Sequence, residues 1–204
     1  MKRFALLVLL LLPAALLAQS PVTAAGGEAS LSAGGEATAF NPDWGCNSSS
    51  PFTCFHNWAV GPTAFLDFNV RNKWGAEGEA RWLEWHSEGK MTLSNYLMGG
   101  RYRLVRFGRF AGWAKFLVGG GWIQTPFYPA AGSLKGSFLA YVPGGTLDYR
   151  LTQRFSLRGD YEYQIWPSFY GQDTISSSGA VVQHNHGLTP NGFSVGFSYR
   201  ILGQ

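Results

Sequence analysis

The stretch Phe155–Ile165, FSLRGDYEYQI, decides the fold because its chemistry alternates from one residue to the next. Each odd-numbered position is apolar, aromatic or glycine, and each even-numbered position is polar or charged. Successive side chains of a β-strand point to opposite faces, so this alternation predicts a strand with one apolar and one polar face. The stretch Phe193–Ile201, FSVGFSYRI, repeats the pattern near the end of the chain.

The same alternation recurs along the chain and predicts eight strands, over residues 28–40, 60–71, 75–86, 94–105, 112–124, 138–149, 154–165 and 192–202. A break in the pattern near Leu83–Trp85 predicts a β-bulge or the end of a strand. Short and long connections alternate between these strands, which puts all short turns on one rim and all long loops on the other. That asymmetry is typical of outer-membrane barrels. The predicted fold is therefore all-β, an eight-stranded antiparallel up-and-down transmembrane β-barrel.

The composition agrees with a folded β-protein. The chain has 204 residues, of which 46% are hydrophobic, 16% aromatic and only 14% charged, and 27 are glycine. A disordered chain would be poor in aromatic residues and rich in net charge. The segment 116–134 carries no charge, but its glycines and prolines exclude a membrane helix.

The first eighteen residues have the pattern of an export signal. Lys2 and Arg3 precede an apolar run, Phe4–Ala18, which is shorter than a membrane-spanning helix. We predict a signal peptide over residues 1–18 with cleavage after Ala18, a short segment over 19–27 and the barrel over 28–202; the alternative is an N-terminal membrane anchor. Without Lys2 and Arg3 the chain keeps 14 basic and 12 acidic residues and has no basic run, so we expect no nucleic-acid partner.

Two orientations of the strands compete. A soluble barrel would turn its apolar face inward, whereas a membrane barrel turns it toward lipid. The apolar faces carry more large rings than an eight-stranded lumen could hold, which favours the membrane. The charged faces carry seven acids and seven bases, as a narrow lumen requires because an unpaired buried charge is costly. The predicted lumen charge network is Glu36, Asp67, Arg71, Glu77, Glu79, Arg81, Arg101, Arg103, Lys115, Asp148, Arg158, Asp160, Glu162 and Arg200.

The chain resembles the OmpA-like, opacity-type family of small outer-membrane barrels, also described as porin-like. The resemblance lies in the architecture over residues 28–202, and its most specific part is the terminal strand Phe193–Ile201. In such families the barrel-assembly machinery recognises a terminal strand that ends in an aromatic residue. In this chain Ile201 stands at the position of that aromatic residue. The resemblance implies a place in the cell outer membrane, with outer-membrane lipids and the assembly machinery as partners.

Few residues offer reactive chemistry. Cys46 and Cys54 are the only cysteines, and in an exported protein we expect them to form a disulfide, with free thiols or a metal site as the alternatives. The four histidines fall in predicted loops or at strand ends, and His184 and His186 alone are too few for a typical zinc site. We expect no metal ligands, no catalytic residues and no cofactor.

The predicted function is structural or surface-interactive, without a large pore, because side chains fill an eight-stranded lumen. The two longest loops, 41–59 and 167–189, are the candidates for contact with an unknown partner. One alternative is a barrel enzyme that modifies lipid, for which Glu84, His86 and Ser87 are the nearest local set. The other is a soluble, lipocalin-like ligand-binding barrel.

Basic residues gather at all three predicted short turns: Arg71, Lys73, Arg106, Arg109, Arg150 and Arg154. At the periplasmic rim they could bind the anionic headgroups of the inner leaflet. Ordinary solvated turn residues would have the same composition, and the sequence leaves the two interpretations open.

Overall fold

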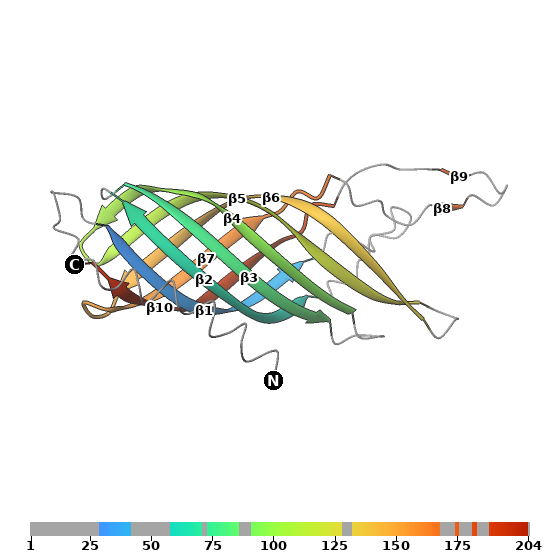
Figure 1. The fold of residues 1–204 in the computed structure, drawn as a ribbon, viewed down its shortest axis with the longest axis horizontal. Coiled ribbons are helices and arrows are strands. Elements are labelled where there is room, and N and C mark those ends of the chain that lie inside the picture. Colours follow the sequence, from blue (N-terminus) through green and yellow to red (C-terminus); the bar gives the residue numbers. More distant parts are fainter. Residues whose placement is uncertain are drawn as a thin grey trace, which may run out of the picture.

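The computed structural model describes residues 29–41, 58–70, 73–85, 91–127, 132–167, 174–175, 181–182 and 188–203 (Figure 1). The described residues form strands, turns and isolated bridges. Among them, no helix is long and apolar enough to cross a membrane.

The long strands close into one antiparallel barrel in the order β1-β10-β7-β6-β5-β4-β3-β2. Every neighbouring pair is antiparallel, and β10 pairs with β1 to close the ring. The strand bounds are β1 Ser30–Asn41, β2 Ala59–Val70, β3 Trp74–Trp85, β4 Met91–Phe107, β5 Phe110–Phe127, β6 Gly132–Arg150, β7 Phe155–Tyr163 and β10 Asn191–Leu202. The all-β fold with eight antiparallel barrel strands is therefore confirmed.

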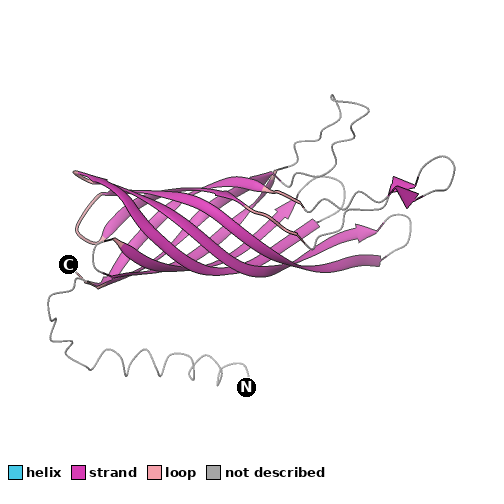
Figure 2. Ribbon diagram, turned by 90° about the horizontal axis from the view of Figure 1, so that it is seen from above, coloured by secondary structure: helices cyan, strands magenta, loops and turns pink. Residues whose placement is uncertain are grey.

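The two ends of the barrel differ. The tight turns lie at the end where the chain terminates, and the small sheet of β8 (Thr174–Ile175) and β9 (Val181–Val182) lies beyond the opposite end (Figures 1 and 2). Between β4 and β5, Gly108 has a φ of 56°, a left-handed conformation that glycine adopts without steric cost. Between β6 and β7, Thr152 Oγ1 accepts hydrogen bonds from the backbone N–H groups of Arg154 and Phe155.

The side chains alternate between the lumen and the outer wall as the two-residue period predicts. On β7, Arg158 is 0% exposed and Glu162 is 1% exposed, whereas Tyr161 between them is 43% exposed. The polar face points inward and the apolar face outward. This is the orientation of a membrane barrel, so the lipocalin-like alternative is wrong.

Aromatic rings form two bands on the outer wall. Toward the short turns, three ring pairs have centroids between 4.6 and 5.0 Å apart: Trp74–Tyr102, Phe110–Tyr149 and Phe155–Tyr199. Toward the loop end, Tyr96 lies edge-on to the rings of Trp82 and Trp122, at 6.2 and 5.8 Å. Amphipathic rings favour the two membrane interfaces, so the apolar wall between the bands faces the hydrocarbon.

The strands differ from their predicted ranges mainly in length. β4, β5 and β6 each begin two to six residues earlier and end one to three residues later than predicted, and β8 and β9 form a two-stranded sheet inside a segment predicted as a loop. The pairing of β3 with β4 shows no register shift near Leu83–Trp85, where the strand ends at Trp85. A register shift does occur between Arg103 and Val105 on β4. These local features depend on neighbouring strands, which the alternation does not report.

Candidate functional site

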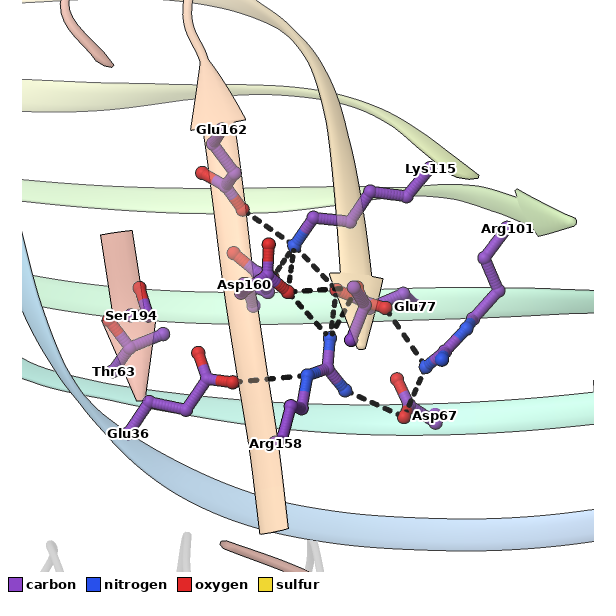
Figure 3. A network of polar contacts seen from close by, with 12 residues as sticks. Glu36, Thr63, Asp67, Glu77, Arg101, Lys115, Arg158, Asp160, Glu162 and Ser194 are labelled. Atoms are coloured by element: carbon purple, nitrogen blue, oxygen red, sulfur yellow. Dashed lines mark hydrogen bonds and ion pairs between the residues drawn. The ribbon is translucent and has the colours of Figure 1, made fainter. Parts of the chain in front are cut away.

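The polar interior of the barrel is the candidate functional site because ten charged side chains of the described residues are buried there. We call these residues the ionic network: the acids Glu36, Asp67, Glu77, Glu79, Asp160 and Glu162, and the bases Arg81, Arg101, Lys115 and Arg158. Figure 3 labels all of them except Glu79 and Arg81. They come from β1, β2, β3, β4, β5 and β7, so strands far apart in the sequence meet at one level of the lumen.

Lys115 on β5 lies among four carboxylates. Its Nζ is 2.9 Å from Glu77 Oε1, 2.5 Å from Glu79 Oε1, 2.8 Å from Asp160 Oδ2 and 2.7 Å from Glu162 Oε1. The carboxylates of Glu77, Glu79 and Asp160 lie within 4.8 Å of one another, close enough to ligate a metal ion. The Lys115 ammonium already supplies a positive charge at that place, so the chain provides its own cation.

Arg158 on β7 joins a second set of carboxylates. Its Nε is 3.0 Å from Glu36 Oε1, its Nη1 is 2.8 Å from Asp67 Oδ2, and its Nη2 is 2.7 Å from Glu77 Oε1 and 3.1 Å from Asp160 Oδ2. A guanidinium is permanently charged and donates from a rigid fork, which allows it to serve several acceptors at once. Glu77 and Asp160 are shared with Lys115, so the two bases form one connected network.

Arg81 extends the network toward the loop end. Its Nη2 donates to Glu79 at 2.9 Å, its Nη1 to Glu162 at 2.8 Å and its Nε to Thr63 Oγ1 at 3.1 Å. The Thr63 hydroxyl in turn lies 2.6 Å from that of Thr38. The guanidinium therefore has a partner on each of its three nitrogens.

Arg101 extends the network toward the short turns. It forms an ion pair with Asp67, a second with Glu77 at 3.1 Å and a third with Asp148 at 3.3 Å. Its guanidinium carbon is 4.1 Å from the centroid of the Trp113 ring. A ring face attracts a cation most strongly where water is excluded, so Trp113 adds to the stabilisation of this charge.

Two further arginines of the network also lie over rings. Arg158 is 3.9 Å from the centroid of Phe65, and Arg81 is 4.7 Å from that of Phe40. The inward rings of Phe40, Phe65 and Trp113, on β1, β2 and β5, therefore contact charged groups.

Glycines on the inner face provide the room that the network needs. A Cβ added at Gly144 would lie 3.1 Å from Lys115 Cε and 3.2 Å from Glu162 Cγ, and one at Gly196 would lie 2.8 Å from Glu36 Cγ. The nearest atoms at the two places are backbone carbonyl oxygens, of Tyr161 and Gly35 respectively, so a larger residue would push on the adjacent strand as well as on a charged side chain.

The fourteen residues predicted for the lumen network occupy different levels. Ten form the ionic network, whereas Arg103, Asp148 and Arg200 are only half-buried and lie nearer the short turns; Arg71 lies outside the described residues. The expected balance of charge does not hold locally. The ionic network has six acids but only four bases, and the surplus of basic groups lies at the short-turn end.

A second structure inside the lumen was missed by the sequence analysis. We call it the apolar plug: Phe40, Ala59, Leu83, Trp85, Leu93, Leu97, Leu117, Ile123, Phe138, Ala140, Val142 and Trp166. It fills the loop end of the barrel, where the rings of Phe138 and Trp166 stack with centroids 3.9 Å apart. The inward apolar residues at Leu83–Trp85 were one signal, because they interrupt the polar face of that strand.

Gln164 joins the plug to the ionic network. Its Oε1 accepts hydrogen bonds from Trp166 Nε1 at 2.9 Å and from Asn95 Nδ2 at 3.3 Å, and its Nε2 donates to Glu162 at 3.3 Å. These bonds give partners to both polar atoms of the Gln164 amide, to Trp166 Nε1 and to Asn95 Nδ2 at the boundary of the apolar cluster.

The remaining sequence predictions concern residues outside the described part of the chain. They are the cleavage site after Ala18, the disulfide between Cys46 and Cys54, and the set that includes His86 and Ser87. The other histidines, His56, His184 and His186, also lie there.

Comparison with known proteins agrees with this geometry. No curated protein matches the chain. Neisserial surface protein A is similar in structure, with a TM-score of 0.55 at 10% identity over 85% of this chain and 98% of that one. The attachment invasion locus protein Ail of Yersinia pestis has a TM-score of 0.50 at 16% identity over 86% of this chain and 99% of that one. At such identities the likeness shows the fold alone.

The family model for the outer membrane protein beta-barrel domain matches residues 4–200, nearly the whole chain. The match agrees with the closed antiparallel barrel, the inward charges and the outward aromatic bands. The resemblance to small OmpA-like barrels and the location in the cell outer membrane are thus confirmed. The chain belongs to the outer membrane protein beta-barrel domain family.

Proposed function

We propose that this outer-membrane barrel is a closed, non-catalytic scaffold that holds its long loops for contact with a partner outside the cell. The observation that carries the proposal is the filling of the lumen at two successive levels. Arg158 in the ionic network and Leu117 in the apolar plug are both 0% exposed. A solute would have to pass a layer of ion pairs and then a layer of packed apolar side chains.

The chemistry of the buried acids supports a non-catalytic role. Each of the six carboxylates in the ionic network lies within 3.1 Å of a basic group. A catalytic acid or base must reach a substrate, and an enzyme acting on lipid needs its reactive groups at the lipid-facing rim. These groups point into the barrel and contact one another.

The outer wall supports lipid as a partner. The two aromatic bands lie toward opposite ends of the barrel, as aromatic rings do at the two interfaces of a bilayer. The last strand, β10, ends in alternating apolar residues, Phe197, Tyr199 and Ile201, which supports recognition by the barrel-assembly machinery.

Ion conductance tests the closed scaffold. We expect the folded full chain in a planar bilayer to show no steady current. A loop-shortened variant, in which short Gly-Ser linkers replace residues 42–57 and 168–187, should also show no steady current. Heat-modifiable gel mobility checks that each protein is folded. A steady current through the wild type contradicts the proposal, and a current through the loop-shortened variant alone contradicts the assignment of the seal to the lumen.

Lipid A mass spectra test the catalytic alternative. Cells with and without the protein should give the same spectrum, because a non-catalytic barrel leaves lipid A unmodified. A new or missing acyl chain that depends on the protein would contradict the non-catalytic role.

Loop contact is tested with a sulfated glycan as the first probe. Ail has been solved in complex with the heparin analogue sucrose octasulfate, which motivates the choice. We expect cells displaying the wild type to be retained on a heparin-coated surface more than cells displaying the loop-shortened variant. Equal retention would contradict loop contact with this ligand.

A further inference from the structure

A polar cavity opens at the short-turn end of the barrel. It has a volume of about 340 Å³, and we call it the vestibule. Six arginines line it: Arg103, Arg106, Arg109, Arg150, Arg154 and Arg200. At about 30 Å³ for each water molecule in the liquid, the cavity holds roughly ten waters. It therefore has room for a ligand with several charged groups.

The vestibule has few acids to balance these charges. Asp67 and Asp148 are the acidic residues in its wall, and both already pair with Arg101. Within the described part of the chain, Arg106, Arg109, Arg150, Arg154 and Arg200 have no carboxylate within ion-pair distance. The six arginines of the vestibule carry six positive charges. Asp148 and the two surplus acids of the ionic network offset three of them, so three positive charges remain.

The inner end of the vestibule is closed. Trp113 and Asp67 lie in its wall and contact Arg101, which belongs to the ionic network. The network and the apolar plug lie between the vestibule and the opposite end of the barrel. A ligand that enters from the short turns would therefore be held in a cavity closed at its inner end and would not pass through the lumen.

Backbone contacts hold several of these arginines in place. The backbone N–H of Arg150 donates to the carbonyl of Arg109 at 2.9 Å, and that of Arg200 donates to the carbonyl of Arg154 at 2.8 Å. Arg154 Nη1 also donates to Tyr199 Oη at 3.1 Å. The positions from which the guanidiniums extend are thus ordered before any ligand arrives, which lowers the entropic cost of binding.

We propose that the vestibule binds a polyanion that carries phosphate groups, on the periplasmic side of the outer membrane. Guanidinium groups match phosphate oxygens with pairs of parallel hydrogen bonds, and arginine is favoured over lysine where such pairs form. Several guanidiniums around one cavity select a ligand with more than one phosphate charge. Short turns of outer-membrane barrels face the periplasm, which gives the side from which the ligand enters.

Two sources could supply this chemistry. One is a soluble polyphosphorylated molecule, and the other is the headgroup of an anionic phospholipid from the inner leaflet. The proposal does not depend on the role of the loops, because the vestibule lies at the other end of the barrel.

The test uses the full chain in nanodiscs and a matched pair of variants. The vestibule variant is Arg200→Gln, which removes one positive charge from the cavity wall. The control is Lys73→Gln, which removes a positive charge from an exposed position on the same rim that is not in the vestibule wall. Heat-modifiable gel mobility checks folding.

In the first arm, inorganic tripolyphosphate is titrated by calorimetry into protein held in phosphatidylcholine nanodiscs. In the second, native mass spectrometry counts cardiolipin, a phospholipid with two phosphate groups, retained by protein from mixed phosphatidylcholine and cardiolipin bilayers. We expect the vestibule variant to lose at least tenfold in affinity in the first arm, or most of the retained lipid in the second. The control should change either quantity by less than twofold.

Binding in the first arm assigns the site to a soluble ligand, and retention in the second alone assigns it to a headgroup. The proposal is overturned if the wild type binds in neither arm. It is also overturned if the control loses as much binding as the vestibule variant, because a diffuse surface charge would then explain the result.

Discussion

The apolar plug and the ionic network occupy the same inner face of the same strands, yet they fill the lumen in opposite ways. On β5 the two regions meet at successive inward positions, where Lys115 contacts four carboxylates and Leu117 packs among apolar side chains. The plug depends on shape and volume, and its members need no particular partner. The network depends on pairing, so the loss of one member leaves others charged and buried. Sensitivity to substitution should therefore differ sharply across two residues of one strand.

The largest effect is expected for Lys115→Met, which keeps the length of the side chain and removes its charge. Four carboxylates would lose a shared partner in a site that excludes water. Breaking a buried pair from one side costs about 3–5 kcal/mol, and we expect a loss of that size in the free energy of unfolding. Urea unfolding in lipid vesicles, followed by tryptophan fluorescence, measures it.

A second variant shows that the loss comes from charge. Lys115→Met/Glu162→Gln removes one of the four acids as well and should recover part of the stability. A loss below about 1 kcal/mol in the single variant, or a further loss in the double variant, would remove the distinction between the network and the plug.

The next effect concerns the space around the network. Gly196→Ala would place a Cβ against the backbone of β1 and the side chain of Glu36, whereas Gly159→Ala on the adjacent β7 meets nothing within 4 Å. Overpacking costs about 1–3 kcal/mol, so we expect that loss for Gly196→Ala and almost none for Gly159→Ala. Equal unfolding midpoints in urea would show that the inner face is not close-packed there.

A smaller effect is expected for Phe65→Leu, which replaces the ring beneath Arg158 by an aliphatic side chain. A desolvated cation–π contact contributes about 1–2 kcal/mol, and leucine retains most of the apolar contact. The same urea titration measures the loss. An unchanged free energy of unfolding would mean that rings in the network only occupy volume, as they do in the plug, and that the cation–π contact adds no stability.

The smallest effect is expected in the plug itself. Ile123→Val removes one methyl group from a side chain that is 3% exposed. Such a change costs about 0.5–1.5 kcal/mol, and it should leave the ion pairs below the plug unaltered. A loss as large as that of Lys115→Met would show that the two regions are not energetically distinct.

Much of the fold could be predicted from the sequence because strand facing is a local property. Arg158, Asp160 and Glu162 alternate with Tyr161 and Tyr163, and that order alone indicates which side chains share a face. The apolar plug could not be predicted in this way. At Leu83 and Trp85 the inward residues are as apolar as the outward Trp82, so the alternation of chemistry disappears although the strand continues.

The sequence by itself determined the number of barrel strands, their facing and the two kinds of connection, because each follows from neighbours along the chain. Only the tertiary structure decided which charges meet. Lys115 reaches Glu77 on β3 and Glu162 on β7, and the stagger of the closed barrel sets which residues of these strands lie at one level. The same stagger separates an acid-rich centre from a base-rich vestibule, a division that a count of charges along the chain cannot contain.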